Sequence, residues 1–421
     1  MQKFEFYQIC KNELPKENLS FPFESLPLCY PPNLYIHIPF CKSKCHYCNF
    51  ISFAGKNDLI DPYFSALKTE MEYYYRKYPK IKLETIYIGG GTPSVADFRF
   101  YQDIFNVLSN LTDISPNAEI TMEINPGTVN LNYLENIKNL GINRLSIGVQ
   151  SFDDKILKDI NRIHSSEEAI ETVKTAKKAG FENISIDLIY GLPGQTPENW
   201  GETLNQALNL DINHISTYGL KIEDGTEFSL HPPKNLPDDE IQSRIYLKTI
   251  EILENNGFNH YEISNFSKQS GSVSRNGCDE QALQAELIFK QGFESQHNLC
   301  CWKNQEYFGL GLNAHGYLDG IRYANTENLN EYLQNPLKRA FENKISKSEK
   351  IEEAIFLGLR LIKGINTEEF KISYGIDLYQ KYSKVIEKYI NYGFMTYENF
   401  DLKLTKQGIL LSNTILAEFL E

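Results

Sequence analysis

The feature that most constrains this sequence is a regular alternation of short β-like runs and longer helical stretches between residues 34 and 220. The runs are "LYIHI" (34–38), "TIYI" (85–88), "EITMEI" (119–124), "RLSIGV" (144–149), "NISIDLIY" (183–190) and "HISTYGL" (214–220). The stretches between them, such as "DPYFSALKTEMEYYYRKY", carry apolar residues at helical spacing. Strands that alternate with helices usually form a parallel sheet with crossover helices. The sequence therefore predicts an α/β fold, a partial (β/α)6 barrel of TIM type, over residues 34–266.

Two segments of different character flank the predicted barrel. Residues 1–33 are rich in proline and polar residues, so we interpret them as an irregular N-terminal leader. Residues 267–345 are expected to connect the barrel to the tail. Within this connection, 270–291 begins with Gly and Ser and is flanked by two "KQ" pairs, which suggests an insertion.

The tail, residues 346–421, has its own signals. Ser346 and Glu349 fit a capping box at the start of an amphipathic helix. Further along, "GFMTYENFDLKLT" predicts a short hairpin, and "KQGILLSNTILAEFL" predicts a closing amphipathic helix. We expect a helical module with a small wing, similar to a winged helix.

Composition limits the class of protein. Hydrophobic residues make up 41% of the 421 residues, which is enough for a large core. The 42 basic and 55 acidic residues give a formal net charge of −13, which argues against a nucleic-acid partner. We find no apolar run of about 18 residues and no signal-peptide pattern at the N-terminus. We therefore expect a cytoplasmic protein, whose cysteines stay reduced and act as metal ligands or buried residues.

The stretch "CKSKCHYC" places Cys41, Cys45 and Cys48 on one short loop. A structural zinc ion needs four ligands, usually from two separated pairs, and no second pair is near in the sequence. His37 or His46 can nevertheless be a fourth ligand. Three thiolates in a compact loop also suit a four-iron cluster that leaves one iron open to a chelating molecule. An iron–sulfur site is favoured, and zinc stays an alternative.

Polar motifs follow the predicted strands. "GGGTPS" comes after the second strand, "EINPGT" lies at the end of the third, and "GVQS" at the end of the fourth. Active sites of parallel barrels gather at the carboxyl ends of the strands. The backbone amides of a glycine-rich loop can also approach an anionic ligand closely, although a plain tight turn explains the glycines as well. We expect these motifs to form one wall of a pocket.

Taken in order, these motifs resemble the radical S-adenosylmethionine (SAM) proteins of the coproporphyrinogen III dehydrogenase-like (HemN/HemW) group. The resemblance rests on "YIHIPFCKSKCHYC", "YIGGGTPS", "TMEINPGT", "LSIGVQSF" and "IDLIYGLPGQT", and extends from about residue 34 to the C-terminus. It implies that Cys41, Cys45 and Cys48 hold a [4Fe–4S] cluster whose open iron chelates SAM. In this group an electron, from a donor such as flavodoxin or ferredoxin, cleaves SAM into methionine and a 5′-deoxyadenosyl radical.

The resemblance also implies a set of SAM-binding residues at the strand ends. Glu123 would pair with the positive groups of SAM, and the glycine loop would meet its methionine part. A zwitterionic sulfonium ligand needs both carboxylates and a cation around it. The implied set is Tyr35, Gly90, Gly91, Thr92, Glu123, Gln150, Arg162, Asp187 and Gly219.

Two subgroups of the family differ just after the third cysteine. The porphyrinogen dehydrogenases carry a fourth cysteine where this chain has Phe50, and the HemW-type heme chaperones lack it. The chaperones also carry a heme-linked motif of the form His-Asn-x-x-Tyr-Trp. Here "HNLCCW" matches it at His297, Asn298 and Trp302, with Cys301 in place of the tyrosine. The sequence therefore resembles the HemW type most, which implies heme as cargo.

Several alternatives stay open at this point. A chaperone would pass heme to an acceptor protein, and would meet a membrane only transiently where that acceptor is a membrane protein. An oxygen-independent coproporphyrinogen III dehydrogenase is the enzyme alternative, and a zinc-binding interaction protein is the alternative of another class. Cys300 or Cys301 can ligate heme iron through sulfur, or both can be buried as small apolar residues.

Overall fold

A computed structural model describes residues 33–79, 81–269 and 292–420. The predicted leader, apart from Asn33, and the predicted insertion lie outside the described residues. Six parallel strands follow one another in the main sheet, and they confirm the predicted α/β class. They are β1 (Asn33–Ile38), β4 (Lys82–Gly90), β5 (Asp113–Ile124), β6 (Arg144–Gln150), β7 (Asn183–Tyr190) and β8 (His214–Gly219).

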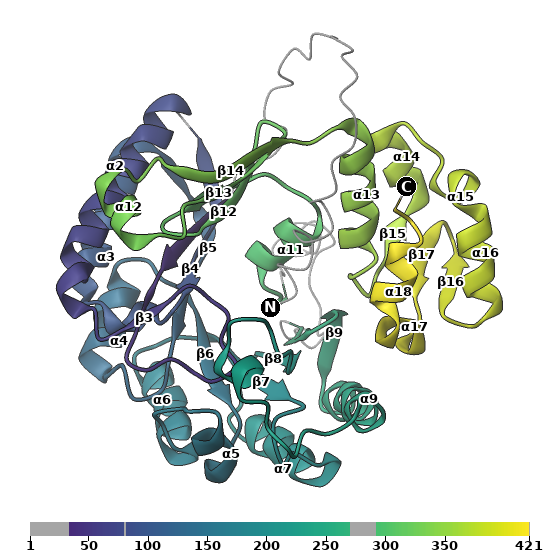
Figure 1. Ribbon diagram of the computed structural model, residues 1–421, viewed down its shortest axis with the longest axis horizontal. Helices are drawn as coiled ribbons and strands as arrows, with labels where there is room; N and C mark the ends of the chain where they lie inside the picture. Colours follow the sequence, from purple (N-terminus) through teal and green to yellow (C-terminus); the bar gives the residue numbers. More distant parts are fainter. Residues whose placement is uncertain (1–32, 80, 270–291, 421) are drawn as a thin grey trace, which may run out of the picture.

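Helices cover the outer side of these strands (Figure 1). Apolar side chains of both layers are fully buried, as for Ile86 and Ile88 of β4 and Leu67 and Met71 of α2. Each such burial contributes about 1.5–3 kcal/mol. The helices of the barrel are α2 (Ile60–Lys77), α3 (Phe98–Leu111), α4 (Leu131–Asn139), α5 (Asp154–Asp159), α6 (Ser166–Lys178), α7 (Pro197–Leu208), α8 (Glu227–Leu230) and α9 (Asp239–Asn255).

The sheet is larger than the sequence predicts, and it stays open. Beyond β8 it adds β10 (Asn265–Lys268) and β9 (Phe258–Glu262). Beyond β1 it adds β11 (Tyr307–Leu310), which is parallel to β1, and three antiparallel strands. These are β12 (His315–Leu318), β13 (Ile321–Asn325) and β14 (Arg339–Lys344). Much of the expected connection 267–345 therefore belongs to the sheet.

Short elements complete the loops at the strand ends. The cysteine loop is bounded by β2 (Phe40–Cys41), which pairs in parallel with β3 (Phe53–Ala54). The 3-10 helices η1 (Asn57–Leu59) and η2 (Pro93–Val95) precede α2 and α3. In the connection, α11 (Gln296–Trp302) lies before β11, and α12 (Leu329–Gln334) lies between β13 and β14.

The tail forms a separate group of helices around a small sheet, on the open side of the barrel (Figure 1). Its first helix, α13 (Lys347–Gly358), begins with the predicted capping box of Ser346 and Glu349. The predicted hairpin is confirmed as β16 (Met395–Glu398) and β17 (Asp401–Leu404), and β15 (Ile365–Asn366) adds a third strand. The other helices are α14 (Thr367–Tyr374), α15 (Leu378–Lys381), α16 (Ser383–Asn391), α17 (Lys406–Leu410) and α18 (Ser412–Ala417).

One prediction for the tail is wrong in detail. The closing segment was expected to be a single helix, and it is two helices that meet at Leu411, whose φ of −106° and ψ of 14° leave the helical range. Within the first of these helices, position 408 needs glycine, because a Cβ there would lie 1.9 Å from the carbonyl oxygen of Phe394.

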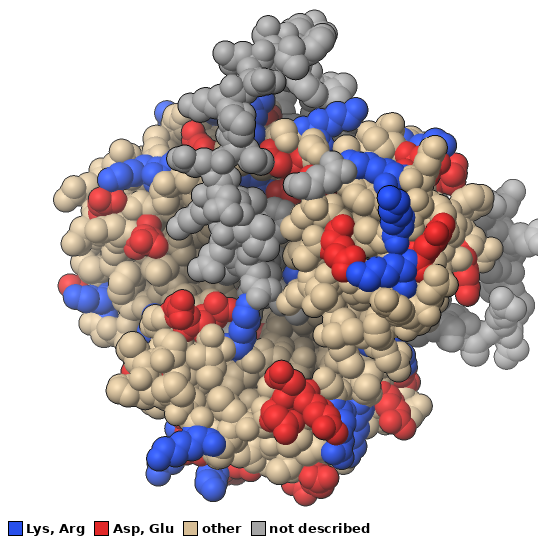
Figure 2. Space-filling model, turned by 45° about the vertical axis from the view of Figure 1, so that its right-hand side comes forward, with Lys and Arg blue, Asp and Glu red and all other residues tan. Residues whose placement is uncertain are grey.

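Two findings concern the surface of the described part of the chain. No helix among the described residues is long and apolar enough to cross a membrane. On the face shown in Figure 2, Lys and Arg side chains alternate with Asp and Glu, and the described residues form no continuous basic surface there.

Candidate functional site

A cavity of about 380 Å³ joins the carboxyl ends of the barrel strands to α11 and to the first helix of the tail. It is lined by every residue of the predicted cluster, SAM and heme-linked sets except Gly219. Beside that glycine, Tyr218 lines the cavity instead. The structure therefore brings together residues that lie as far apart in the sequence as Tyr35 and Trp302.

The three loop cysteines lie at one side of this cavity. The sulfur of Cys41 accepts a hydrogen bond from Thr92 Oγ1 at 3.5 Å, and the sulfur of Cys45 accepts one from Arg162 Nη1 at 3.4 Å. Burial raises the pKa of the Cys41 thiol, and it raises that of Cys48 to about 11. Binding of a metal to these two sulfurs would therefore release protons.

The donor set suits a cluster better than a single ion. Among the described residues, no three His, Cys, Asp or Glu side chains converge closely enough to hold one metal ion. In a four-iron cluster each thiolate binds its own iron, so the sulfurs need not converge on one point.

Of the two histidines proposed as a fourth zinc ligand, His37 has both ring nitrogens engaged, and His46 has one. His37 binds the Ile51 carbonyl oxygen through Nε2 at 3.0 Å and Tyr35 Oη through Nδ1 at 2.9 Å. Burial lowers its pKa to about 4. His46 uses Nδ1 for the Asp159 carbonyl oxygen at 3.1 Å.

The glycine loop at the end of β4 packs directly on Glu123 at the end of β5. Glu123 accepts hydrogen bonds from the Gly90 amide at 2.9 Å and from Tyr87 Oη at 2.8 Å. A Cβ on Gly89 would lie 2.8 Å from the Glu123 carboxylate, and one on Gly90 would lie 2.5 Å from the His37 ring. Both positions therefore need glycine for this close approach.

Two buried carboxylates give the cavity a place for positive charge. Burial, together with the nearby Asp187 carboxylate, raises the pKa of Glu123 to about 7. Asp187 accepts hydrogen bonds from Ser146 Oγ at 2.9 and 3.1 Å, and burial raises its pKa as well. A cationic ligand between these carboxylates would favour their charged forms. Gln150, which ends β6, reaches the same cavity from a left-handed backbone with φ of 67°.

Arg162 connects the cysteine loop to the strand ends. Besides Cys45, it donates through Nη2 to Asn125 Oδ1 and to the Gly148 carbonyl oxygen, both at 2.6 Å. Asn125 in turn donates to Thr92 Oγ1 at 2.7 Å. Asn125 was missing from the predicted set, although it is the asparagine of the "EINPGT" motif.

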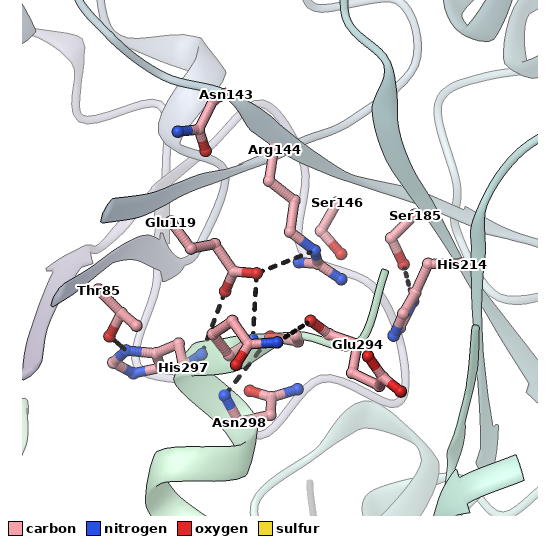
Figure 3. Close-up of polar contacts among 12 residues, drawn as sticks. Thr85, Glu119, Asn143, Arg144, Ser146, Ser185, His214, Glu294, His297 and Asn298 are labelled. Carbon is pink, nitrogen blue, oxygen red and sulfur yellow. Dashed lines mark hydrogen bonds and ion pairs between the residues drawn. The ribbon is translucent and has the colours of Figure 1, made fainter. Parts of the chain in front are cut away.

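The predicted heme-linked motif lies on α11, where His297, Asn298 and Trp302 face the cavity together with Cys301. The N-terminus of this helix lies against Glu119 of β5. The two carboxylate oxygens of Glu119 accept the amide N–H groups of Gln296 and His297, both at 3.1 Å (Figure 3). Behind Glu119, the buried guanidinium of Arg144 lies 4.0 Å away. Sequence reasoning missed Glu119 and Arg144, because single charged residues inside strands carry no motif.

The side of the cavity formed by the tail is aromatic and cationic. The Arg360 guanidinium lies 4.3 Å from the centroid of Phe356 and 5.6 Å from that of Trp302. Arg322 of β13 makes a bidentate ion pair with Glu353 of α13, at 2.9 and 2.8 Å. Flat aromatic faces and guanidinium groups suit a planar ligand that carries carboxylates.

Comparison with known proteins gives a consistent result along the chain. Residues 35–207 match the radical SAM superfamily, and residues 345–411 match the HemN C-terminal domain. The heme chaperone HemW of Lactococcus lactis is 35% identical over 395 residues, which cover 93% of this chain and 97% of that protein. HemW of Bacillus subtilis is 36% identical, covering 92% and 98%, and HemW of Escherichia coli is 32% identical, covering 93% and 98%.

Among solved structures, the radical SAM enzyme coproporphyrinogen III oxidase (HemN) of Escherichia coli has a similar fold. The TM-score is 0.77 at 23% identity, and the match covers 93% of this chain and 91% of that one. At this identity the likeness establishes the fold alone.

Proposed function

This chain belongs to the HemW family of heme chaperones within the radical SAM superfamily, and from this premise we propose that it binds a [4Fe–4S] cluster, SAM and heme, and passes the heme to an acceptor protein. The observation that carries the proposal is the single cavity that the cysteine loop, the two buried carboxylates and α11 share.

For the cluster and SAM, the residues present fit the groups that the superfamily implies. Cys41, Cys45 and Cys48 would hold the cluster, with Arg162 balancing the charge of the thiolates. When bound, the reduced cluster supplies the electron that cleaves SAM. Glu123 and Asp187 would bind the positive groups of SAM, and the glycine loop would meet its methionine part through backbone N–H groups. Tyr35 and Gln150 also line this part of the cavity.

For the cargo, the support comes from α11 and the tail. His297, Asn298 and Trp302 line the cavity together with Phe356 and Arg360 of the tail. Its volume of about 380 Å³ lies within the range of small-molecule sites. We infer that heme binds in the part of the cavity that Trp302 and Phe356 line. We also propose that an acceptor protein takes the heme, that flavodoxin or ferredoxin donates the electron, and that the protein works in the cytoplasm.

One experiment on one sample tests the proposal. The protein is reconstituted anaerobically with iron and sulfide, and SAM cleavage and heme binding are then measured by product analysis and by the Soret band. We expect iron and sulfide in a four-to-four ratio and stoichiometric heme uptake. Zinc without sulfide, or no heme uptake, would contradict it.

A second candidate is the oxygen-independent coproporphyrinogen III dehydrogenase, because this chain shares the fold of HemN. Phe50 lines the cavity at the position where that subgroup carries a fourth cysteine. The same reconstituted sample, reduced and supplied with SAM and coproporphyrinogen III, distinguishes the two. Formation of protoporphyrinogen would establish the dehydrogenase activity.

A further inference from the structure

Asn125, directly after β5, lies between two side chains that contact the sulfurs of the cysteine loop. Its Nδ2 donates to Thr92 Oγ1 at 2.7 Å, and its Oδ1 accepts from Arg162 Nη2 at 2.6 Å. Thr92 in turn donates to the sulfur of Cys41 at 3.5 Å, and Arg162 donates to that of Cys45 at 3.4 Å. One amide therefore connects the donors on two of the three predicted cluster ligands.

These hydrogen bonds have only one consistent direction. The Arg162 guanidinium can only donate, so the atom of Asn125 that faces it must be the carbonyl oxygen. The NH2 group of Asn125 then faces Thr92, whose hydroxyl oxygen must accept. A hydroxyl has one proton, and because this oxygen accepts from Asn125, the proton is left for the sulfur of Cys41.

The backbone and the surroundings of Asn125 are fixed as well. Its N–H donates to Ser94 Oγ at 3.4 Å, and its carbonyl oxygen accepts from Thr128 Oγ1 at 2.6 Å. Gly148 of β6 leaves space for the side chain, because a Cβ there would lie 2.6 Å from Asn125 Oδ1. The amide is therefore in position before any cofactor binds.

Donors on the sulfur ligands change how easily an iron–sulfur cluster is reduced. Hydrogen bonds to the sulfurs and the nearby charge are among the factors that set its reduction potential. Reduction adds one negative charge, so donors and cations beside the thiolates stabilise the reduced form more than the oxidised form. Loss of such donors should therefore make the reduction potential more negative.

We propose that Asn125 is a positioning residue that keeps two hydrogen-bond donors on the cluster sulfurs and so raises the reduction potential of the cluster. The two donors are Thr92 and Arg162. The inference rests on the proposed function, because it takes the three loop cysteines as ligands of a [4Fe–4S] cluster. Asn125 acts through its two neighbours and supplies no ligand itself.

The reduction potential is the direct test. The full chain is reconstituted anaerobically, and the reduced cluster is measured by electron paramagnetic resonance during a redox titration without SAM. Asn125→Leu keeps the approximate size of the side chain and removes both hydrogen bonds without adding charge. We expect the ratio of reduced to oxidised cluster at a given potential to fall about three- to tenfold, which for one electron is a midpoint about 30–60 mV more negative. An unchanged or more positive midpoint would overturn the proposal.

The matched control carries the same substitution away from the cysteine loop. Asn132 is exposed on α4, and Asn132→Leu should leave the midpoint unchanged. Iron content and melting temperature are measured for both variants, so that the midpoints are compared between folded proteins with full clusters. An equal shift in the two variants would contradict a specific role of Asn125.

A second pair keeps the test decisive if Asn125→Leu does not fold. Thr92→Val keeps the shape of the side chain and removes the hydroxyl that donates to Cys41, so its midpoint should also become more negative. Thr92→Ser keeps the hydroxyl and should titrate like the wild type. Equal midpoints in Thr92→Val and the wild type would overturn the proposed effect of these donors.

The double variant separates a positioning role from a general effect on the fold. Because Asn125 acts partly through Thr92, Asn125→Leu should shift the midpoint less in the Thr92→Val protein than in the wild type. Fully additive shifts would refute the connection between the two residues. A wild-type protein that takes up no iron and sulfide would contradict the proposed function itself, whereas a complete cluster with unshifted variants refutes only the role of Asn125.

Discussion

Among the loop cysteines, Cys45 accepts a hydrogen bond from the Arg162 guanidinium at 3.4 Å. The bond from Arg162 balances the charge that a thiolate ligand carries, and it also fixes the loop to β5 and β6 through Asn125 and Gly148. We expect Cys45→Ser to lose most of its iron and sulfide and to keep its barrel, because the residue is half-buried on a loop. Iron and sulfide analysis with circular dichroism checks both points. Cys300→Ser, on α11, is the matched control, and full iron content in Cys45→Ser would contradict the assignment.

The carboxylate of Glu123 makes SAM binding dependent on pH. Its pKa is raised to about 7 by burial, so at pH 6 most of the molecules carry a neutral acid. Because only the charged form attracts the ammonium and sulfonium groups of SAM, affinity should rise with pH. We expect the Kd for SAM to fall about eightfold between pH 6 and pH 7.5, measured by equilibrium dialysis on reconstituted protein.

The control for this prediction is a pair of Glu-to-Gln variants. Glu123→Gln should bind SAM more weakly at both pH values and lose the pH dependence. Glu84→Gln removes an exposed carboxylate that pairs with Lys82 on β4, and it should behave like the wild type. If Glu123→Gln keeps the full pH dependence, another group is responsible.

At the scale of elements, α2 and the added strands of the sheet are joined by one buried carboxylate. Glu70 of α2 accepts hydrogen bonds from the Gly311 amide at 2.8 Å, Tyr332 Oη at 2.7 Å and Asn325 Nδ2 at 2.7 Å, and Arg339 Nη1 lies 3.7 Å away. All these donors belong to the segment from β11 to β14. The contact fixes the extension on the outside of the barrel.

Glu70→Gln should therefore weaken this junction. The NH2 group of the introduced glutamine would face the donors that now bind the Glu70 carboxylate. At least one hydrogen bond is therefore lost, and a buried donor is left without an acceptor. We expect the free energy of unfolding to fall by about 1–3 kcal/mol, measured by urea denaturation. Glu72→Gln on the same helix removes only a surface ion pair with Arg76 and should change it by less than about 0.5 kcal/mol. Similar losses in the two variants would contradict this role.

The elements of this fold differ in how well the sequence predicts them. The six barrel strands are predictable because each is an apolar run bounded by polar turns, and the capping box of α13 is a local pattern. The strands β12 and β13, "HGYL" and "IRYAN", are too short and too mixed to stand out. The helix that was expected to be single breaks at Leu411, in a sequence that is apolar and helix-like on both sides of the break.

At the scale of the whole molecule, the site is assembled from parts that are distant in sequence. The glycine loop and the cysteines can be recognised as motifs in the sequence, and their place at the strand ends follows from the barrel. The place of α11 does not, because the bond between the His297 amide and Glu119 joins residues 178 positions apart. The contribution of the tail does not follow from the barrel either, because Glu353 and Arg360 of the tail line the same cavity.

The ion pair of Arg322 and Glu353 bridges the sheet and the tail. Arg322 lies on β13 and Glu353 on α13, and their side chains are 15% and 3% exposed. Arg322 also donates to Asn304 Oδ1 at 2.7 Å, which connects the pair to the end of α11. Because the pair is desolvated, removing one partner leaves a buried charge, whereas replacing both by apolar residues does not.

We therefore expect Glu353→Leu to lower the free energy of unfolding by about 3 kcal/mol, and Glu353→Leu with Arg322→Met to recover most of that loss. Urea denaturation followed by tryptophan fluorescence measures both, since Trp302 lies beside the Arg360 guanidinium at this junction. If the double variant is as unstable as the single one, the pair itself, rather than the uncompensated charge, holds the tail on the barrel. In that case heme affinity should fall in both variants, because α13 forms one wall of the cavity.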